Sequence, residues 1–261
     1  MKMLKVQSSW FKESGQRLDA SYHLSDGPIT KLKLKNSPFA LTTLSQECER
    51  IFSGNIFKRS FVESEEYGWP YITGSDMMKT EIDSGKFISK KYTTQKDNLA
   101  LRKGWILVTC SGTLGNVVFT NEEFSDKIAT HDLIRIVPKN KNILSGFLFA
   151  YLASKYGHGL LTQASYGGVV KHIEPHHIED LPIPIFPSKL QTSINRLVTS
   201  SSELREEAAC LLASVKSEFS SLDINYKYGS SSIENVSINQ ISKTNKRFDS
   251  LYAIVSCKNR A

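Results

Sequence analysis

The stretch that decides the fold spans residues 188–222 and reads SKLQTSINRLVTSSSELREEAACLLASVKSEFSSL. Its apolar residues recur at alternating steps of four and three, the spacing of a coiled-coil seam. The seam positions are Leu190, Ile194, Leu197, Ser201, Leu204, Ala208, Leu211, Val215, Glu218 and Leu222. A helix of this length extends about 50 Å, far beyond the average globular helix. We therefore expect a spacer helix that pairs with another helix through this stripe.

The chain just before this helix predicts where it begins. Ser188 and Gln191 have the S-x-x-Q spacing of a capping box, and the three prolines of residues 181–187 favour an extended lead into it. Ser201 and Glu218 interrupt the apolar stripe, so a long surface helix packed on its own domain is the alternative interpretation. The length of the stripe favours the pairing helix.

Composition places the chain among ordinary globular proteins. It has 261 residues, of which 40% are apolar and 23% charged. It contains no apolar run long enough to cross a membrane and does not begin like a signal peptide, so we expect a cytoplasmic protein with no membrane contact. Its cysteines, Cys48, Cys110, Cys210 and Cys257, form no C-x-x-C pair, which argues against a zinc site and a disulfide framework.

The balance of charge favours a polyanionic partner. The formal net charge is +7 and the isoelectric point is near 9.1. Basic residues gather between positions 79 and 103 among aromatic and small polar residues, a mixture that suits phosphate neutralisation and contacts with base edges. They are Lys79, Lys86, Lys90, Lys91, Lys96, Arg102 and Lys103. A solvated, charged loop is the alternative interpretation of this stretch.

Short segments rich in β-branched and aromatic residues predict strands over 71–73, 105–110, 116–120 and 133–137. Helical spacing follows over 143–155, and glycines at 157 and 159 are expected to end that helix before a shorter one over 160–165. Glycines at 112 and 115 join two predicted strands. Because the chain has no phosphate-loop motif, we interpret them as a hairpin turn.

An internal repeat appears when residues 6–22 are laid on residues 236–252. The shared signature is Arg-apolar-Asp-small-x-Tyr, with Arg17, Asp19 and Tyr22 matching Arg247, Asp249 and Tyr252. The domain organisation predicted is therefore a recognition domain over 1–187, the helix over 188–222, and a linker with the beginning of a second repeat over 223–261.

Several stretches, taken in order, resemble those of the DNA-specificity subunits of type I restriction-modification systems, over essentially the whole chain. They are Arg17-Leu-Asp-Ala-Ser-Tyr22, Pro70-Tyr-Ile-Thr-Gly-Ser-Asp76, Lys103-Gly-Trp-Ile-Leu-Val-Thr-Cys-Ser-Gly-Thr-Leu-Gly115, Tyr166-Gly-Gly-Val-Val-Lys-His-Ile173 and Ile178-Glu-Asp-Leu-Pro-Ile-Pro184, followed by residues 191–194, which open the helix. Each stretch is degenerate by itself, and their order is what is specific.

The resemblance implies a target recognition domain of mixed α/β build with a β-rich core, followed by a long helix that packs antiparallel against its counterpart. In this family two such domains each read half of a split double-stranded DNA site. The paired helices dock methyltransferase subunits and, through them, a restriction subunit. This sequence departs from the pattern because it has one complete domain and one helix. Either a second copy supplies the other half, which predicts a homodimer, or the chain is a fragment of a longer subunit.

Catalytic and metal-binding signals are weak in this sequence. We find no methyltransferase motif of the Asn-Pro-Pro-Tyr type and no glycine-rich cofactor loop, so we predict no catalysis and no cofactor. His172, His176 and His177 lie near Glu174 and Glu179, but Pro175 interrupts this group on an irregular segment. We therefore predict no metal site.

The residues expected to contact DNA are the polar and basic ones of the predicted loops: Lys58, Arg59, Lys79, Lys90, Lys91, Tyr92, Arg102, Ser111, Thr113 and Lys171. Arg59 and Arg102 are the expected base readers, because a guanidinium pairs bidentately with guanine while lysines suit phosphates. The expected helix interface comprises Leu190, Ile194, Leu197, Leu204, Ala208, Leu211, Val215 and Leu222. The alternative function is an interaction scaffold or decoy that binds methyltransferase subunits through the helix without reading DNA.

Overall fold

A computed structural model describes residues 5, 8–13, 18, 20–93, 96–163, 165 and 171–221, and the account below concerns these residues. The chain divides into two compact units, Met1–Val215 and Lys216–Ala261. The described part of the second unit, residues 216–221, is the end of the last helix. Of the predicted internal repeat, residues 236–252 lie wholly outside the described residues, and so do residues 6, 7, 14–17 and 19 of the first stretch. Residues 166–170 and Leu222 also lie outside them.

Strands build two four-stranded sheets and a two-stranded one. The first sheet has the order β2 (Cys48–Ser53), β9 (Leu133–Pro138), β6 (Ile106–Thr109) and β7 (Val117–Phe119), and all its pairs are antiparallel. The second has the order β3 (Phe61–Val62), β5 (Phe87–Ser89), β4 (Gly68–Ile72) and β8 (Ile128–Ala129), in which β4 and β8 run parallel. The short pair joins β1 (Leu41–Thr43) to β10 (Pro182–Pro184).

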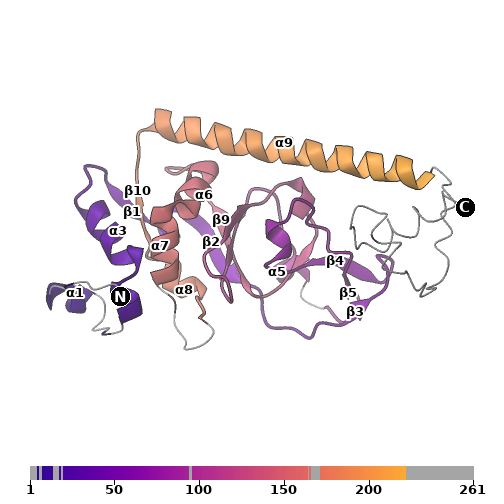
Figure 1. The fold of residues 1–261 in the computed structure, drawn as a ribbon, viewed down its shortest axis with the longest axis horizontal. Coiled ribbons are helices and arrows are strands. Elements are labelled where there is room, and N and C mark those ends of the chain that lie inside the picture. The colour runs from indigo at the N-terminus through magenta and orange to yellow at the C-terminus, as the bar shows by residue number, and fades with distance from the viewer. Residues whose placement is uncertain are drawn as a thin grey trace, which may run out of the picture. The chain divides into compact units, whose positions relative to one another are not determined.

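Helices of very different length surround these sheets, and the longest is α9 (Ser188–Ser221). Figure 1 shows α3, α6 and α7 gathered at one end of the first unit, with α9 running past α6. The shorter helices are α1 (Ser8–Glu13), α2 (Ala20–His23), α3 (Asp26–Lys35), α4 (Leu44–Glu47), α5 (Lys96–Leu99), α6 (Ser145–Ala153), α7 (Lys155–Gln163) and α8 (Pro175–Ile178), with 3-10 turns η1 (Asp76–Met78) and η2 (Glu122–Phe124). No helix among the described residues is long and apolar enough to span a membrane.

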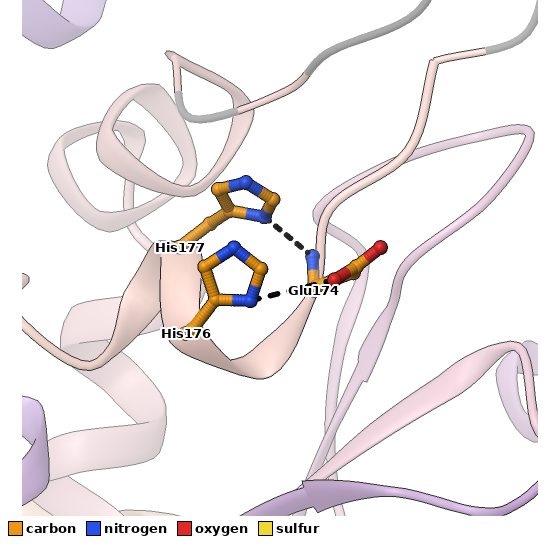
Figure 2. Close-up of side chains that lie close together, drawn as sticks. All are labelled: Glu174, His176 and His177. Carbon is orange, nitrogen blue, oxygen red and sulfur yellow. Dashed lines mark hydrogen bonds and ion pairs between the residues drawn. The ribbon is translucent and has the colours of Figure 1, made fainter.

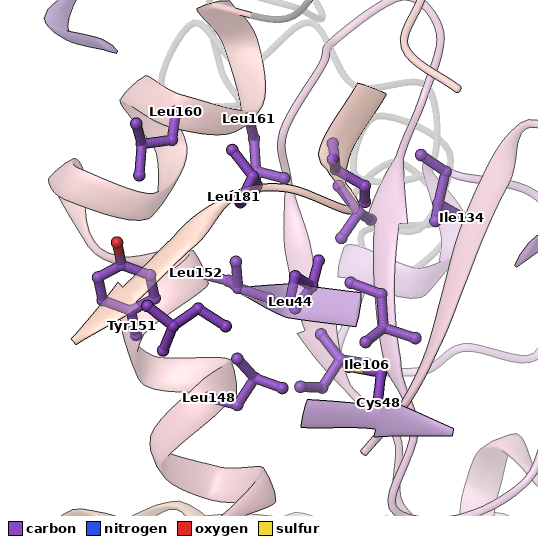
Figure 3. Packing of buried hydrophobic residues seen from close by; sticks show 14 of the residues in the cluster. Leu44, Cys48, Ile106, Ile134, Leu148, Tyr151, Leu152, Leu160, Leu161 and Leu181 are labelled. Carbon is purple, nitrogen blue, oxygen red and sulfur yellow. The ribbon is translucent and has the colours of Figure 1, made fainter. Parts of the chain in front are cut away.

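The main hydrophobic cluster lies between the first sheet and the helices α6 and α7. Figure 3 shows Leu148 and Leu152 of α6 pointing toward Leu44 and toward Ile106 and Ile134 of the sheet. Each of these five side chains is fully buried. At about 25 cal/mol per Å² of apolar surface, such side chains supply most of the favourable free energy of folding. The prediction of a mixed α/β domain with a β-rich core and a long helix is confirmed.

The predicted strands are confirmed to within a few residues, and so is the helix expected over 143–155. The expectation that Gly157 and Gly159 end a helix is wrong, because α7 runs through both. A Cβ atom at Gly157 would overlap the backbone of Tyr151 and Leu152, and one at Gly159 would lie 3.0 Å from Asp26 Cβ. These glycines are therefore needed for close packing of α7 on α6 and α3.

The predicted hairpin at Gly112 and Gly115 is confirmed, since β6 and β7 pair antiparallel on either side of it. Both glycines have positive φ, 68° and 77°, a conformation that L side chains rarely adopt. A Cβ atom at Gly115 would also lie 2.9 Å from Nδ1 of His158 in α7. The turn is thus held against α7 as well as by its own strands.

A polar face attaches α9 to its own domain. The Gln191 amide donates to the carbonyl oxygens of Phe186 at 2.9 Å and Asn142 at 3.2 Å, and its oxygen accepts from Leu144 N–H at 3.3 Å. One turn on, Asn195 Oδ1 accepts from Gly146 N–H at 2.9 Å. The capping box expected from Ser188 and Gln191 is wrong, because the Gln191 side chain binds Phe186 and the residues just before α6 instead.

Further along α9 the attachment becomes ionic. Glu206 accepts from the backbone N–H of Glu122 at 2.8 Å and pairs with Lys103 at 3.0 Å. The Glu122 hydrogen bond and the Lys103 ammonium lower the pKa of Glu206 despite partial desolvation. The alternative interpretation, a helix packed on its own domain, therefore describes one face of α9.

Replacing Gln191 with Leu tests this attachment. The side chain is only 4% exposed, and leucine has a similar volume without its donors and acceptors, so the partner groups become unsatisfied. We expect a loss of about 1–3 kcal/mol in the free energy of unfolding. Urea denaturation measures it, with the exposed neighbour Thr192→Ala as the matched control. Equal stability of Gln191→Leu and wild type would contradict the anchoring role.

The reactivity of the cysteines tests the burial of the core. Burial raises the pKa of both Cys48 and Cys110 to about 12, and the neighbouring Asp132 carboxylate adds to the effect at Cys110. Because a raised pKa keeps these thiols protonated at pH 8, we expect iodoacetamide to modify exposed Cys210 and to spare both. Peptide mapping by mass spectrometry reads this out, with denatured protein as the control. Modification of Cys48 or Cys110 at the rate of Cys210 in folded protein would contradict the burial.

Candidate nucleic-acid interface

Three strands from the two large sheets end at a common edge. The parallel pairing of β4 with β8 brings Thr73 beside Thr130, whose N–H donates to Ile72 O at 3.0 Å. The pairing of β6 with β9 brings Cys110 to Asp132, where Cys110 N–H donates to Asp132 O at 3.2 Å. The loops that follow these strands are rich in polar residues. We call Arg59 together with residues 73–76, 110–113 and 130–132 the polar edge.

The first loop of the polar edge is organised by a buried carboxylate. Asp76 Oδ2 accepts from Thr73 Oγ1 at 2.6 Å and from Thr73 N–H at 3.0 Å, while Oδ1 accepts from Lys79 Nζ at 2.6 Å. Burial alone would raise the pKa of Asp76, but the hydrogen bonds from Lys79 and Thr73 lower it. Asp76 is therefore ionised at neutral pH, and the Lys79 ammonium is already paired with it.

The second loop holds an arginine from the segment between β2 and β3. Arg59 Nη2 lies 3.2 Å from Thr130 Oγ1, 3.2 Å from His131 Nδ1 and 3.4 Å from Asp132 Oδ2. The Arg59 and Asp132 side chains are each 38% exposed, so this ion pair is partly accessible to a ligand. Because the charges of Arg59 and Asp132 cancel, the pair is better suited to directional hydrogen bonds with a ligand than to neutralising phosphates.

A buried guanidinium lies directly beneath this loop. Arg135 of β9 is fully buried, and its Nη atoms donate to the carbonyl oxygens of Leu99, Ala129, Thr130 and Leu133 at 2.9 to 3.3 Å. Within the described chain no carboxylate forms an ion pair with it. Burial lowers the pKa of Arg135 to about 10, so it remains positively charged at neutral pH. This fixed positive charge favours anions above the polar edge.

The third loop of the polar edge contacts residues that follow in the chain after α7. Ser111 forms an antiparallel bridge with His172, and Ile173 N–H donates to Cys110 O at 3.0 Å. Lys171, next to His172, is exposed. The Thr109 hydroxyl donates to Thr113 O and shapes the hairpin from inside. The bridge therefore places Lys171 beside the polar edge, to which Ser111 belongs.

A second group of basic and aromatic residues lies at the other end of the β4–β5 pair, where Ser89 pairs with Gly68. It comprises Tyr67, Lys90, Lys91 and Tyr92, which we call the basic turn. Lys90 Nζ donates to the carbonyls of Glu65 and Glu66, and Lys91 Nζ lies 5.5 Å from the centre of the Tyr92 ring. Both tyrosines are more than 60% exposed, which suits stacking or phosphate contacts.

The residues expected to contact DNA thus do not form one continuous patch. Arg59, Lys79, Ser111, Thr113 and Lys171 lie at or beside the polar edge, and Lys58 is the exposed neighbour of Arg59. Lys90, Lys91 and Tyr92 form the basic turn. Arg102 lies apart, in the turn that precedes β6, at the end of that strand opposite the polar edge.

Sequence reasoning missed residues that hold the polar edge together: Thr73, Asp76, Thr130, His131, Asp132 and Arg135. Polar residues at or just beyond the end of a predicted strand are a usable signal for Thr73 and Asp76, since the sequence predicts a strand over 71–73. The strand β8 is only two residues long, so Thr130 and its neighbours gave no such signal. A charged residue inside the apolar strand β9 is a signal for the buried Arg135.

Figure 2 shows Glu174, His176 and His177 gathered at the start of α8. Each residue offers one atom that could hold a metal ion, and these atoms lie within 4.8 Å of one another. His177 Nδ1 accepts from Glu174 N–H at 3.0 Å, and His176 Nδ1 lies 3.4 Å from Glu174 Oε2. The hydrogen bond uses the Nδ1 lone pair of His177, which leaves its Nε2 protonated in the neutral ring. These residues therefore fit a helix cap better than a metal site.

The face of α9 turned away from the domain carries the predicted stripe. Leu190, Leu197, Leu204, Leu211 and Val215 are between 45% and 68% exposed, and we call these five the leucine seam. Ala208 is also exposed, whereas Ile194 packs against the main hydrophobic cluster. Exposed leucines spaced by seven along one helix form a contiguous apolar strip that a second helix can cover.

The solved structures to which this chain is similar include three of low sequence identity. A type I restriction-modification S subunit from M. genitalium is 16% identical (TM-score 0.47), covering 68% of this chain and 43% of its own. The HsdS subunit from Thermoanaerobacter tengcongensis is 14% identical (TM-score 0.45), covering 77% and 51%. The type IIG restriction endonuclease BpuSI is 11% identical (TM-score 0.47), covering 76% and 30%. This chain spans about half or less of the length of each.

Comparison with curated proteins gives no match. Comparison with family models gives one whose description is type I restriction modification DNA specificity domain, and it matches residues 43–206. The matched residues run from the end of β1 through both large sheets and the polar edge to Glu206 in α9. Because they make up more than half of the chain, the chain belongs to the family of type I restriction modification DNA specificity domains.

Proposed function

We propose that this chain is a DNA-recognition subunit that confers sequence specificity on a type I restriction-modification complex and reads one half of a bipartite target. The observation that carries the proposal is the family match, which includes the polar edge and the first part of α9. The polar edge offers directional donors and acceptors above a buried cation, and the net charge of +7 suits a polyanion. We infer that the chain itself catalyses no reaction and that methylation belongs to partner subunits.

Within this proposal the two surfaces of the recognition domain have different tasks. The polar edge, where Arg59 is paired and oriented, suits contacts with base edges, because such contacts need fixed directions. The basic turn, where the lysines stand beside exposed tyrosines, suits contacts with the sugar-phosphate backbone. Residues 1–187 would then form the reading domain, and α9 would set its position relative to a partner.

We also propose that the leucine seam pairs with the leucine seam of a second copy, and that the paired helices dock methyltransferase subunits. An isologous pairing of two antiparallel helices places the same residues on both sides of the interface. It also removes the exposed apolar strip from water. Because the polar face of α9 is engaged by its own domain through Gln191, Asn195 and Glu206, the seam is the face left for this contact.

Replacing Lys90 and Lys91 with Gln tests DNA binding. We expect weaker binding to duplexes of any sequence and a slope of log affinity against log salt that is shallower by up to about two, because each phosphate contact releases about one counterion. Fluorescence anisotropy at several salt concentrations measures this. The matched control is Lys139→Gln with Lys141→Gln, which removes two charges beyond the C-terminal end of β9, away from the polar edge.

An unchanged salt slope in the Lys90 and Lys91 variant would contradict the backbone role of the basic turn. Absence of duplex binding by the wild-type chain, together with capture of a methyltransferase subunit, would favour the second candidate function. That candidate is an interaction scaffold or decoy, and the exposure of the leucine seam is the observation in its favour.

Replacing both Leu204 and Leu211 with Glu tests the pairing of two copies. Both side chains are at least 60% exposed, so the domain should stay folded, while charges in the seam prevent its burial. We expect dimers for wild type and monomers for the variant in sedimentation velocity. The control, Ser193→Glu with Ser200→Glu, adds the same charges to exposed positions of α9 outside the seam. A wild-type chain that is monomeric at high concentration would contradict the pairing.

A further inference from the structure

Arg59 is oriented entirely through one of its nitrogens. The contacts with Thr130, His131 and Asp132, at 3.2 to 3.4 Å, all involve Nη2. Among the described residues, Nε and Nη1 of Arg59 have no hydrogen-bond partner. The side chain is 38% exposed, so these two groups retain N–H donors for a ligand at the polar edge. They point to different edges of the guanidinium, so a fork toward one base would combine Nη1 or Nε with Nη2, whose present contacts are long, at 3.2 to 3.4 Å.

The turn that holds Arg59 is itself fixed from several sides. Thr130 N–H donates to Ile72 O of the neighbouring strand, and the Thr130 hydroxyl lies 3.2 Å from Asp132 Oδ2. The Asp132 carbonyl accepts from Cys110 N–H. From beneath, Arg135 donates to the carbonyls of Ala129 and Thr130. Since the turn is constrained at its backbone and at its side chains, Arg59 loses little conformational freedom when it binds a ligand.

The charge of the surroundings separates two possible targets of Arg59. A phosphate would meet the Asp132 carboxylate beside the guanidinium, and repulsion would offset part of the attraction. A base edge carries no formal charge, so it avoids this repulsion and gains from the fixed direction of the donors. The base edge that offers two acceptors to one guanidinium is that of guanine, through O6 and N7.

We propose that Arg59 reads a guanine in the target half-site and that Asp132 is the positioning residue that sets the direction of its guanidinium. This inference rests on the proposed function, because it concerns how the same surface selects its DNA. The proposal assigns this role to Arg59 and not to Arg102. Arg102 lies at the end of β6 opposite the polar edge, away from the side chains that orient Arg59.

Selection from a pool of random duplexes, followed by affinity measurements, tests the proposal with the full chain. We expect wild type to enrich a motif with a guanine, and to lose about five- to hundredfold in affinity when that G·C pair becomes A·T. Arg59→Lys keeps the charge but lacks the fork, so the preference should fall below about twofold at that position alone, with an unchanged salt slope. Asp132→Asn should reduce the preference several-fold at the same position.

The matched control is Asp126→Asn, which removes a carboxylate from an exposed position in the loop before β8, at the end of that strand opposite the turn that holds Arg59. Asp126 has a φ of 62°, a conformation that asparagine also adopts readily, so this variant should keep the wild-type preference. Circular dichroism confirms that each variant is folded. Because Arg59 is exposed and keeps its charge in Arg59→Lys, this variant tests the proposal even where Asp132→Asn unfolds.

Two results would overturn the inference while leaving the proposed function standing. One is a selected motif without guanine, and the other is a guanine preference that survives Arg59→Lys. A wild-type chain that enriches no motif would remove the proposed function and this inference with it. Loss of preference at every position in Asp132→Asn, with normal folding, would show that Asp132 acts on the whole surface and not on Arg59.

Discussion

The architecture of the recognition domain depends on the Arg135 guanidinium, which joins the two large sheets from inside. Arg135 belongs to β9 of the first sheet, and its carbonyl partners include Ala129 of β8 in the second sheet and Leu99 of α5. Taking a charged group out of water is costly unless its donors find acceptors, so the surrounding backbone must keep its carbonyls pointed inward at the two Nη atoms. Among the described residues, the buried Nε of Arg135 has no hydrogen-bond partner. Gly54 belongs to this arrangement, because a Cβ atom there would lie 2.7 Å from Leu99 and 3.3 Å from Arg135.

The elements that could be predicted from sequence are those whose signal is local. The apolar repeat of α9, the β-branched strands β6 and β9, and the glycine turn at Gly112 and Gly115 each depend on neighbours a few positions away. The glycines of α7 misled the prediction because their role is not local. Gly157 allows contact with Tyr151 and Leu152 of α6, and Gly159 allows contact with α3. Glycine can end a helix or allow it to pack closely on another, and the sequence alone does not distinguish these two roles.

The candidate site was predicted only in part, because it is assembled from strand pairings that sequence spacing does not reveal. Arg59 and Asp132 are 73 positions apart. The pairings of β4 with β8 and of β6 with β9 place the turn that contains Asp132, and Arg59 reaches it from the segment between β2 and β3. Likewise, Glu206 resembles a solvated charge on a helix until Lys103, 103 positions earlier, is found beside it. Residue type indicated candidates for binding, and tertiary pairing decided which of them meet.

The two faces of α9 share one rigid helix, and this restricts how its length can change. Each inserted residue turns everything beyond it by about 100° and advances it by about 1.5 Å. A single insertion between Asn195 and Glu206 would therefore carry the carboxylate away from Lys103 and swing the later leucines out of line with the earlier ones. Seven inserted residues nearly restore the phase, with a drift of roughly 20°. Whole heptads should thus keep the leucines in line, but each one also moves Glu206 about 10.5 Å along the axis and away from Lys103. The length of this helix therefore behaves as a stepped quantity for the seam, and each step requires new contacts on the polar face.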